Sequence, residues 1–271
     1  MNSIAIFSDL HLSARPSARN RAFENLLKSW RGPRAGSATL AELNTGSATL
    51  AELNTGSATL AELWLLGDIF DLLIGPYEFW NDTHRAIFAE LERLAREGVQ
   101  VLWIEGNHDF HIGALLEPRG IRLEHGAVVR KVNGRRIYLA HGDLVNGADH
   151  AYLRWHAFVR SPLFRFVMHS IPGTLADRFL VPLGERLSHE SRSRDRYDPK
   201  LRDLYVNFAR ARWREGFDGV CLGHCHIPEQ LLEDGRFYFN MGSWIGGEYR
   251  YGWWDADREP LPEFKIVPNI I

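Results

Sequence analysis

The chain has 271 residues, with 32 Lys and Arg against 34 Asp and Glu, and a formal net charge of −2. Its hydrophobic fraction of 45% and charged fraction of 24% are those of an ordinary globular domain, which excludes a disordered or collagen-like protein. Two cysteines, Cys221 and Cys225, are too few for a secreted disulfide framework. The chain reaches Asp9 without a basic region, and its longest charge-free stretches have 11 residues. We therefore expect neither a signal peptide nor a membrane span, which needs ~20 apolar residues.

The charge is unevenly distributed along the chain. Residues 151–214 contain 13 basic and six acidic residues, a net charge of +7 that leaves −9 on the rest. A cationic block beside an acidic body indicates an anionic partner, although a solvated helical face would give the same pattern. We expect no nucleic acid partner, because the segment contains no known nucleic-acid-binding module. The sequence leaves the oligomeric state open.

Short apolar runs recur from the first residues onward, and each run ends in a polar cluster. A run of four to six aliphatic or aromatic residues that is followed by a turn residue predicts a buried strand. The runs are 3–8, 63–66, 99–104, 137–140 and 219–222.

Helices and hairpins are predicted among these strands. Apolar residues at helical spacing predict helices over 21–30 and 82–97. The dipeptides Asn-Gly at 133–134 and Asp-Gly at 234–235 predict tight hairpin turns. Strands that alternate with helices and then form hairpins predict a mixed α/β sandwich.

A perfect decamer repeat interrupts this pattern. The same octapeptide, GSATLAEL, occurs at 36–43, 46–53 and 56–63, with Asn-Thr between the copies. Identity at every position is unlike a diverged repeat architecture, and only the last copy continues into an apolar run. We interpret 36–63 as a tandem duplication of a loop-to-strand connector that lies at the surface.

Residues 149–214 have helical periodicity, are divided by prolines, and lie between two strand-plus-motif units. We therefore expect a basic helical insertion, or lid, at 149–214. The core then consists of residues 1–148 and 215–271.

Eight side chains with metal-binding chemistry follow the predicted strands. They are Asp9, His11, Asp68, Asn107, His108, His141, His224 and His226. The carboxyl ends of parallel strands meet at one edge of a sheet, so these side chains can converge. Imidazole, carboxylate and carboxamide groups suit two borderline divalent ions, with Mn²⁺ as the first candidate and Fe²⁺ or Zn²⁺ as alternatives. The other seven histidines are expected to be ordinary core or surface residues.

The spacing within two of the clusters is also informative. Residues i and i+2 of an extended chain point to the same side. We therefore expect Asp9 and His11 to bind one ion together from an extended segment, and His224 and His226 to do the same.

The motifs resemble those of the calcineurin-like metallophosphoesterases. The family pattern Asp-x-His, Gly-Asp, Gly-Asn-His-Asp, His-Gly-Asp and Gly-His-x-His is matched at every position between residues 3 and 244, apart from the decamer repeats. The resemblance implies an α/β fold, the metallophosphoesterase-type αββα sandwich, here with an inserted helical lid. It also implies a ligand set: Asp9, His11 and His226 for one ion, Asn107, His141 and His224 for the other, and Asp68 as the bridge. In that family, His108 is not a ligand and faces the substrate phosphate.

Electrostatics favour phosphate chemistry at such a site. Two divalent ions carry four positive charges and the predicted ligands supply only two carboxylates, so the site attracts phosphate and lowers the pKa of a bound water to ~7. His108 is a catalytic candidate that stabilises phosphoryl charge or protonates the leaving group. Asp109 is a candidate to orient His108, and a turn residue that caps the following segment is the alternative. Together these features predict a metal-dependent hydrolase.

Within the family, the chain most resembles the UDP-2,3-diacylglucosamine pyrophosphatases of lipid A biosynthesis, which release UMP and 2,3-diacylglucosamine 1-phosphate. The similar features are residues 8–12, residues 65–71 and the insertion after His141. The resemblance implies a set of substrate-binding residues: Asn107, His108, Asp149, Tyr152, Ser188, Arg192, Arg194 and Arg196. That subfamily commonly has arginine where this chain has His108. The alternatives are a phosphoesterase acting on another nucleotide or a phosphomonoester, and a non-catalytic family scaffold.

The insertion also has the composition of a lipid-binding element. Its apolar residues Leu163, Phe164, Phe166, Val167, Met168, Leu175, Phe179 and Leu180 lie among Arg160, Arg165 and Arg178. They would bind acyl chains, at about 0.8 kcal/mol for each buried methylene, or form the core of the insertion itself. The same mixture favours an anionic membrane surface. We expect a cytoplasmic protein that is peripheral on the inner face of the inner membrane and takes a lipid-linked nucleotide as substrate.

Overall fold

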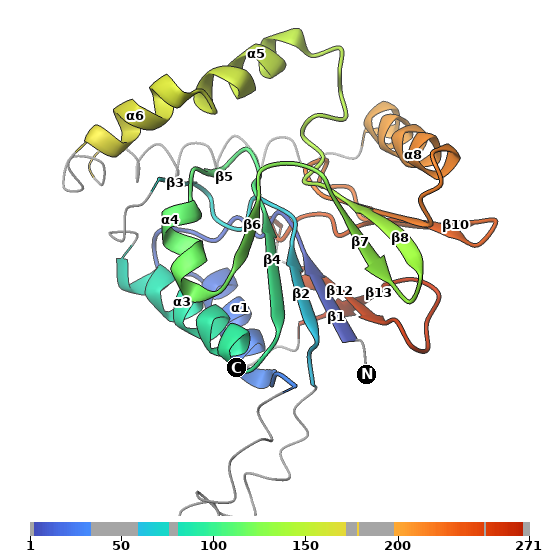
Figure 1. Ribbon diagram of the computed structural model, residues 1–271, viewed down its shortest axis with the longest axis horizontal. Helices are drawn as coiled ribbons and strands as arrows, with labels where there is room; N and C mark the ends of the chain where they lie inside the picture. Colours follow the sequence, from blue (N-terminus) through green and yellow to red (C-terminus); the bar gives the residue numbers. More distant parts are fainter. Residues whose placement is uncertain are drawn as a thin grey trace, which may run out of the picture.

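Two β-sheets packed face to face form the centre of the fold (Figure 1). The computed structural model describes residues 3–33, 59–75, 81–171, 178, 198–246 and 248–267. The six-stranded sheet has, in spatial order, β13 (Glu263–Ile266), β12 (Arg250–Asp255), β1 (Ser3–Phe7), β2 (Glu62–Leu65), β4 (Gln100–Ile104) and β6 (Arg122–Glu124). The five-stranded sheet has β10 (Glu229–Glu233), β11 (Arg236–Asn240), β9 (Gly219–Leu222), β8 (Arg135–Leu139) and β7 (Val128–Val132). A short parallel pair, β3 (Leu73–Ile74) and β5 (Asp109–Phe110), lies beside them.

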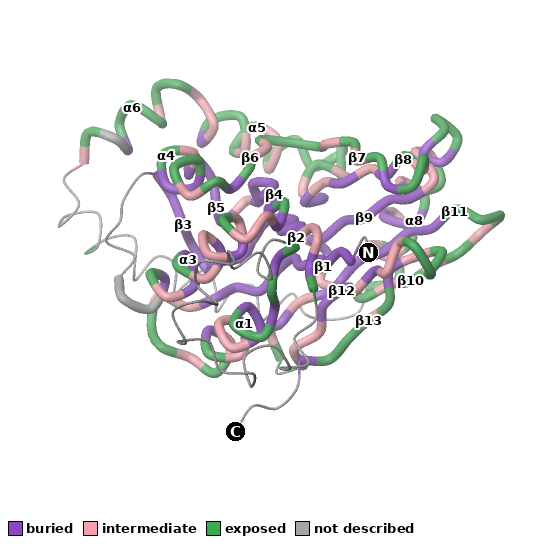
Figure 2. Tube along the Cα trace, turned by 60° about the horizontal axis from the view of Figure 1, so that its bottom comes forward, coloured by how far each residue is buried: buried purple, intermediate pink, exposed green. Residues whose placement is uncertain are grey.

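Alternation along the central strands produces two cores. Ile4 and Ile6 of β1 belong to the core between the sheets, which also contains Phe237 and Phe239 of β11. Because successive strand residues point to opposite faces, the alternate residues of β1 join a different core against the helices. Figure 2 shows β1 and β9 as buried segments in the middle of the molecule.

Helices cover both outer faces of this double sheet. The face of the six-stranded sheet is covered by α1 (Ala18–Ser29) and α3 (Asn81–Arg96), with α4 (Gly113–Leu116) and the 3₁₀ turn η1 (Glu117–Arg119) beside them (Figure 1). The predicted αββα sandwich is confirmed. The helix predicted over 21–30 begins earlier, at Ala18, because the Ser17 side chain accepts a hydrogen bond from the Asn20 backbone nitrogen and caps the helix there.

The helix α8 (Pro199–Arg214) covers the outer face of the five-stranded sheet. Its residues Tyr205, Ala209 and Trp213 are buried against Val220 of β9 and Tyr238 of β11. The sequence predicts that this helix belongs to the insertion at 149–214, and the structure corrects that prediction. The helix α8 forms the fourth layer of the sandwich, because its apolar face is buried against the five-stranded sheet.

The helices α5 (His150–Val159) and α6 (Pro162–Ser170) lie above the sheet edge opposite the N-terminus (Figure 1). Val159 and Met168 are buried against the core, whereas Leu163, Phe166 and Val167 are exposed. The prediction that the apolar residues of the insertion form its own core therefore holds only in part. Leu175, Phe179 and Leu180 lie outside the described residues. In the part of the chain that the structure describes, no helix is long and apolar enough to cross a bilayer.

The chain closes on itself at the base of the decamer repeats. Arg31 and Thr59 form a parallel bridge, with the Leu60 nitrogen donating to the Arg31 carbonyl at 2.8 Å. Leu60 and Leu63, from the last repeat copy, are fully buried. The repeat residues before 59 lie outside the described residues, and their surface position stays a prediction.

Deletion of residues 44–63 should leave the fold and its melting temperature nearly unchanged. The first repeat copy then joins Trp64 and supplies the same residues as the copy that now forms β2. Each doubling of a flexible loop costs only ~0.6 kcal/mol, so a shorter loop should be neutral or slightly stabilising. Thermal unfolding followed by circular dichroism measures this effect. As a control, deletion of 34–63 removes the equivalents of Leu60 and Leu63 and should prevent folding; loss of folding in the shorter deletion would contradict the interpretation.

Candidate metal centre

The eight predicted metal-site residues come together where five strands end. In the six-stranded sheet, β1, β2 and β4 are parallel neighbours, and in the five-stranded sheet β8 and β9 are parallel neighbours. The loops that follow these five strands carry all eight side chains. Packing of the two sheets therefore places residues from both halves of the sandwich at one edge.

Five of the eight residues have left-handed backbone conformations. The φ values are 53° for Asp9, 46° for His11, 54° for Asp68, 66° for His224 and 58° for His226. Non-glycine residues rarely adopt this region, and they cluster at functional sites when the surrounding structure holds them there. The expectation that each i, i+2 pair binds one ion from an extended segment is wrong: all four residues have left-handed conformations, and His224 and His226 belong to different clusters.

Hydrogen bonds between neighbouring loops hold these turns. The backbone nitrogens of Asp9 and His11 donate to the carbonyls of Gly67 and Asp68, both at 3.1 Å. The His224 backbone nitrogen donates to Asp9 Oδ2 at 2.8 Å and so joins the loops of the two sheets. Asp9 Oδ1 then faces the imidazole of His226.

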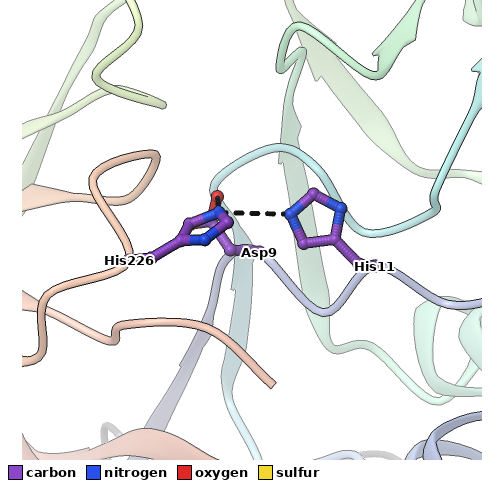
Figure 3. A group of neighbouring side chains, drawn as sticks. All are labelled: Asp9, His11 and His226. Carbon is purple, nitrogen blue, oxygen red and sulfur yellow. Dashed lines mark hydrogen bonds and ion pairs between the residues drawn. The ribbon is translucent and has the colours of Figure 1, made fainter. Parts of the chain in front are cut away.

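The first cluster consists of Asp9, His11 and His226 (Figure 3). The two Nε2 atoms of His11 and His226 are 3.2 Å apart, and His226 Nε2 is 3.4 Å from Asp9 Oδ1. Asp9 and His11 are fully buried. Two imidazole nitrogens and a carboxylate oxygen thus converge on one point.

The second cluster consists of Asp68, Asn107, His141 and His224. His141 Nε2 lies 3.4 Å from Asp68 Oδ2, 3.1 Å from Asn107 Oδ1 and 3.2 Å from His224 Nδ1. Asp68 also groups with His11 and His108, so its carboxylate lies between the two clusters.

These groups fit divalent metal ions. The His141 Nδ1 atom is 2.8 Å from the Leu66 carbonyl oxygen, so Nδ1–H donates a hydrogen bond there and Nε2 is the nitrogen that can bind a metal ion. Such a bond from the second ring nitrogen is the usual support of a metal-binding histidine. Imidazole nitrogens whose lone pairs face one another beside ionised carboxylates repel, and a divalent cation removes that repulsion. The donor set is the one that Mn²⁺, Fe²⁺ and Zn²⁺ accept.

The protonation states of three of these residues agree with this assignment, and that of His141 does not. Burial opposes ionisation of Asp68, but the neighbouring His141 and His108 outweigh it and hold its pKa well below the ordinary value. Burial, followed by His108 and His226, lowers the pKa of His11 well below the ordinary value. Burial, followed by His141, lowers the pKa of His224 to about 4. At neutral pH these groups therefore offer an ionised carboxylate and two neutral imidazoles. Burial opposes protonation of His141, but the charge of Asp68 outweighs it and raises the pKa of His141 well above the ordinary value, so a metal ion would displace a proton there.

The site also requires close backbone approaches at two glycines. A Cβ at Gly106 would lie 2.5 Å from the Asp68 backbone nitrogen, and one at Gly223 would lie 2.5 Å from Asp9 Oδ2. Either side chain would push a metal-site carboxylate out of place, so both positions need glycine.

His108 is oriented by a backbone carbonyl. Its Nδ1 atom is 2.7 Å from the Asp71 carbonyl oxygen, and its Nε2 atom is 3.8 Å from Asp68 Oδ2. The imidazole is therefore held with Nε2 toward the centre, where it can meet a phosphoryl oxygen.

Asp109 does not orient His108. Its fully buried carboxylate accepts hydrogen bonds from the backbone nitrogens of Asp68, Ile69 and Gly106, at 3.1, 2.9 and 2.6 Å. Burial and the charge of Asp68 raise the pKa of Asp109 to about 8, against these backbone donors. Asp109 is a positioning residue that joins the loops after β2 and β4. This structural role is closer to the alternative, a turn residue, than to the predicted catalytic role.

The predicted substrate-binding residues are only partly described. Asp149 is exposed and caps α5, accepting from the Tyr152 backbone nitrogen at 2.9 Å. The Tyr152 hydroxyl donates to Asp143 Oδ2 at 2.6 Å, and its ring lies 6.2 Å from that of His224. The predicted roles of Ser188, Arg192, Arg194 and Arg196 stay predictions, because these residues lie outside the described part of the chain.

Sequence reasoning missed three residues beside the centre. Asp143 Oδ2, on a half-buried residue, lies 3.5 Å from His156 Nε2, and Arg160 donates from Nη2 to the Gly106 carbonyl at 2.8 Å. Asp143 belongs to the quoted His-Gly-Asp motif, and His156 and Arg160 follow Tyr152 at intervals of four. That spacing on one helix face was the signal available in the sequence.

Comparison with known proteins agrees with this geometry. The family model of the calcineurin-like phosphoesterases matches residues 3–228. The chain belongs to this family, and we conclude that it is a metal-dependent hydrolase.

Two curated relatives carry the same name. The UDP-2,3-diacylglucosamine hydrolase of Pseudomonas syringae pv. tomato is 27% identical over 99% of this chain and 98% of its own length. The protein of that name from Ralstonia nicotianae is 32% identical over 89% of this chain and 83% of its own. A solved archaeal phosphodiesterase covers 98% of this chain and 99% of its own, at 12% identity and a TM-score of 0.45.

Asn107→Ala and His224→Ala should each lower the amount of bound metal and abolish turnover, because each removes a ligand atom from the second cluster. Metal content by mass spectrometry and hydrolysis of a chromogenic phosphodiester measure the two effects. His150→Ala, at an exposed position on α5, is the control. Full activity in Asn107→Ala would contradict the metal-site assignment.

His108→Ala should separate the loss of turnover from the loss of bound metal. If His108 faces the phosphate rather than a metal ion, the variant keeps its metal and loses rate by about 100- to 10,000-fold, the range for a general acid or base. Metal content equal to that of Asn107→Ala would instead make His108 a ligand.

Proposed function

We propose that the protein hydrolyses the pyrophosphate bond of UDP-2,3-diacylglucosamine to UMP and 2,3-diacylglucosamine 1-phosphate, a reaction of lipid A biosynthesis. The observation that carries this proposal is a site fit for divalent metal beside helices with an exposed apolar surface. Phosphate chemistry needs the first feature and a diacylated substrate needs the second. The names of the curated relatives support the same substrate.

Two divalent ions, Mn²⁺ in the first instance, would be held by the two clusters, with Asp68 between them. When bound, they supply the positive charge that activates water and polarises the phosphoryl group. His108 directs Nε2 toward the same region and stabilises the phosphoryl oxygens or protonates the leaving phosphate. Asp109 keeps the loops of Asp68 and Asn107 in register.

Purified protein with Mn²⁺ should convert UDP-2,3-diacylglucosamine to UMP and a lipid monophosphate, followed by chromatography and mass spectrometry. Parallel assays with Fe²⁺ and Zn²⁺ identify the preferred metal. Hydrolysis of simple phosphate esters alone would reject this substrate and indicate the alternative, an enzyme for another nucleotide or a phosphomonoester.

The proposal extends to the location of the protein, on the inner face of the inner membrane. The apolar side chains Trp155, Phe158, Leu163 and Phe166 of α5 and α6 are between 52% and 70% exposed. Burial of such side chains in a bilayer surface is favourable, and the net charge of +3 over residues 151–171, which contain three arginines and no acidic residue, adds attraction to anionic lipids.

Leu163→Ser combined with Phe166→Ser should reduce flotation of the protein with vesicles of phosphatidylethanolamine and phosphatidylglycerol. Leu232→Ser, which removes an equally apolar side chain from β10, is the matched control and should float like the wild type. Equal flotation of all three proteins would contradict docking through α5 and α6.

A further inference from the structure

A cavity of about 160 Å³ adjoins the metal centre. Its lining includes the metal-site residue His141, the following Asp143, Arg160 at the end of α5 and Arg212 of α8. One water needs about 10–15 Å³ of such space, so the cavity has room for a much larger chemical group. The cavity is a candidate binding site for a part of the substrate that extends away from the metal centre.

Arg160 has unused hydrogen-bond donors in this cavity. Its side chain is 16% exposed, and its Nε and Nη1 atoms are buried without a hydrogen-bond partner among the described residues. Nε is 3.9 Å from Glu105 Oε2, which is too far for a hydrogen bond. Buried donors of a cation are destabilising when they lack an acceptor, so they mark a place for one.

The neighbouring charged groups are already engaged. Arg212 pairs with Glu215 at 2.6 Å, and its guanidinium lies 5.0 Å from the centre of the Phe208 ring. Glu105 lies 3.0 Å from His125 and accepts the backbone nitrogen of His111 at 2.7 Å. Arg212 also has one buried nitrogen, Nε, without a hydrogen-bond partner among the described residues, but Arg160 has two, so Arg160 is the cation of this cavity with the most unused donors.

Several contacts hold Arg160 in place beside the metal centre. Nη2 donates to the carbonyl of Gly106, the residue before Asn107, and the guanidinium carbon lies 5.5 Å from the centre of the Phe110 ring. The preceding carbonyl of Val159 is 2.8 Å from His111 Nε2. The end of α5 is thus attached to the loop that carries a metal ligand.

We propose that this cavity is an anion subsite of the active site. In it, Arg160 binds the second phosphate group of the substrate, the one whose phosphorus is not attacked by water. The inference rests on the proposed pyrophosphate substrate. Arginine is well suited to phosphate because its donors are planar and permanently charged. Arg160 then gives the enzyme a preference for diphosphates over phosphate monoesters and simple diesters.

Calorimetric titrations with UMP and with the non-hydrolysable α,β-methylene analogue of UDP test the subsite. The wild type should bind the diphosphate more tightly than UMP. Arg160→Gln should weaken diphosphate binding roughly 10- to 100-fold, the value of a charge-assisted hydrogen bond to phosphate, with little change for UMP. Arg160→Lys, which keeps the charge, should lose less. Arg154→Gln, at an exposed position on the same helix, is the matched control.

Two results would overturn the proposal. One is a wild type that does not prefer the diphosphate. The other is an equal loss for both ligands, or loss of bound metal, in folded Arg160→Gln, since Arg160 would then act only through the Asn107 loop. Hydrolysis of the UDP-linked lipid by the wild type is scored separately. Its absence would reject the proposed function, whereas the two titrations still decide the subsite.

Discussion

Asp68 is a carboxylate with 1% exposure between two groups of histidines, and burial of such a charge costs several kcal/mol unless compensating groups surround it. His141 and His108 supply that compensation. The carboxylate also accepts the His108 backbone nitrogen at 2.8 Å, so it positions the loop that carries Asn107. The arrangement of the other ligands around the centre depends on this one buried charge.

A second buried carboxyl group, that of Asp109, supports Asp68. The Asp109 side chain accepts hydrogen bonds from backbone nitrogens of the Asp68 and Gly106 loops. The left-handed turns at Asp9 and Asp68 are strained, and backbone hydrogen bonds from adjacent loops hold them in place. The strands, the Asp109 hydrogen bonds and the bonds between neighbouring loops together hold the ligands of the centre in position.

The helices α5 and α6 combine two surfaces that serve different chemistry. On one side, Tyr152, His156 and Arg160 reach toward the centre. On the other side, Trp155 and Phe166 are exposed. A helix pair built in this way places an exposed apolar surface beside the polar metal centre.

The sandwich, the strands that precede the polar motifs and the candidate metal-site residues could be predicted from the sequence, because apolar runs and short polar motifs are local signals. The sequence also identified the hairpins, since Asn133 and Asp234 adopt the left-handed φ values of 49° and 48° that such turns need. The hydrogen bonds of Asp109, the packing of α8 on the sheet and the approach of Arg160 to Gly106 became visible in the folded chain alone. These depend on contacts between segments distant in the chain, and a side chain's partner across such a distance leaves no periodic signal in the sequence.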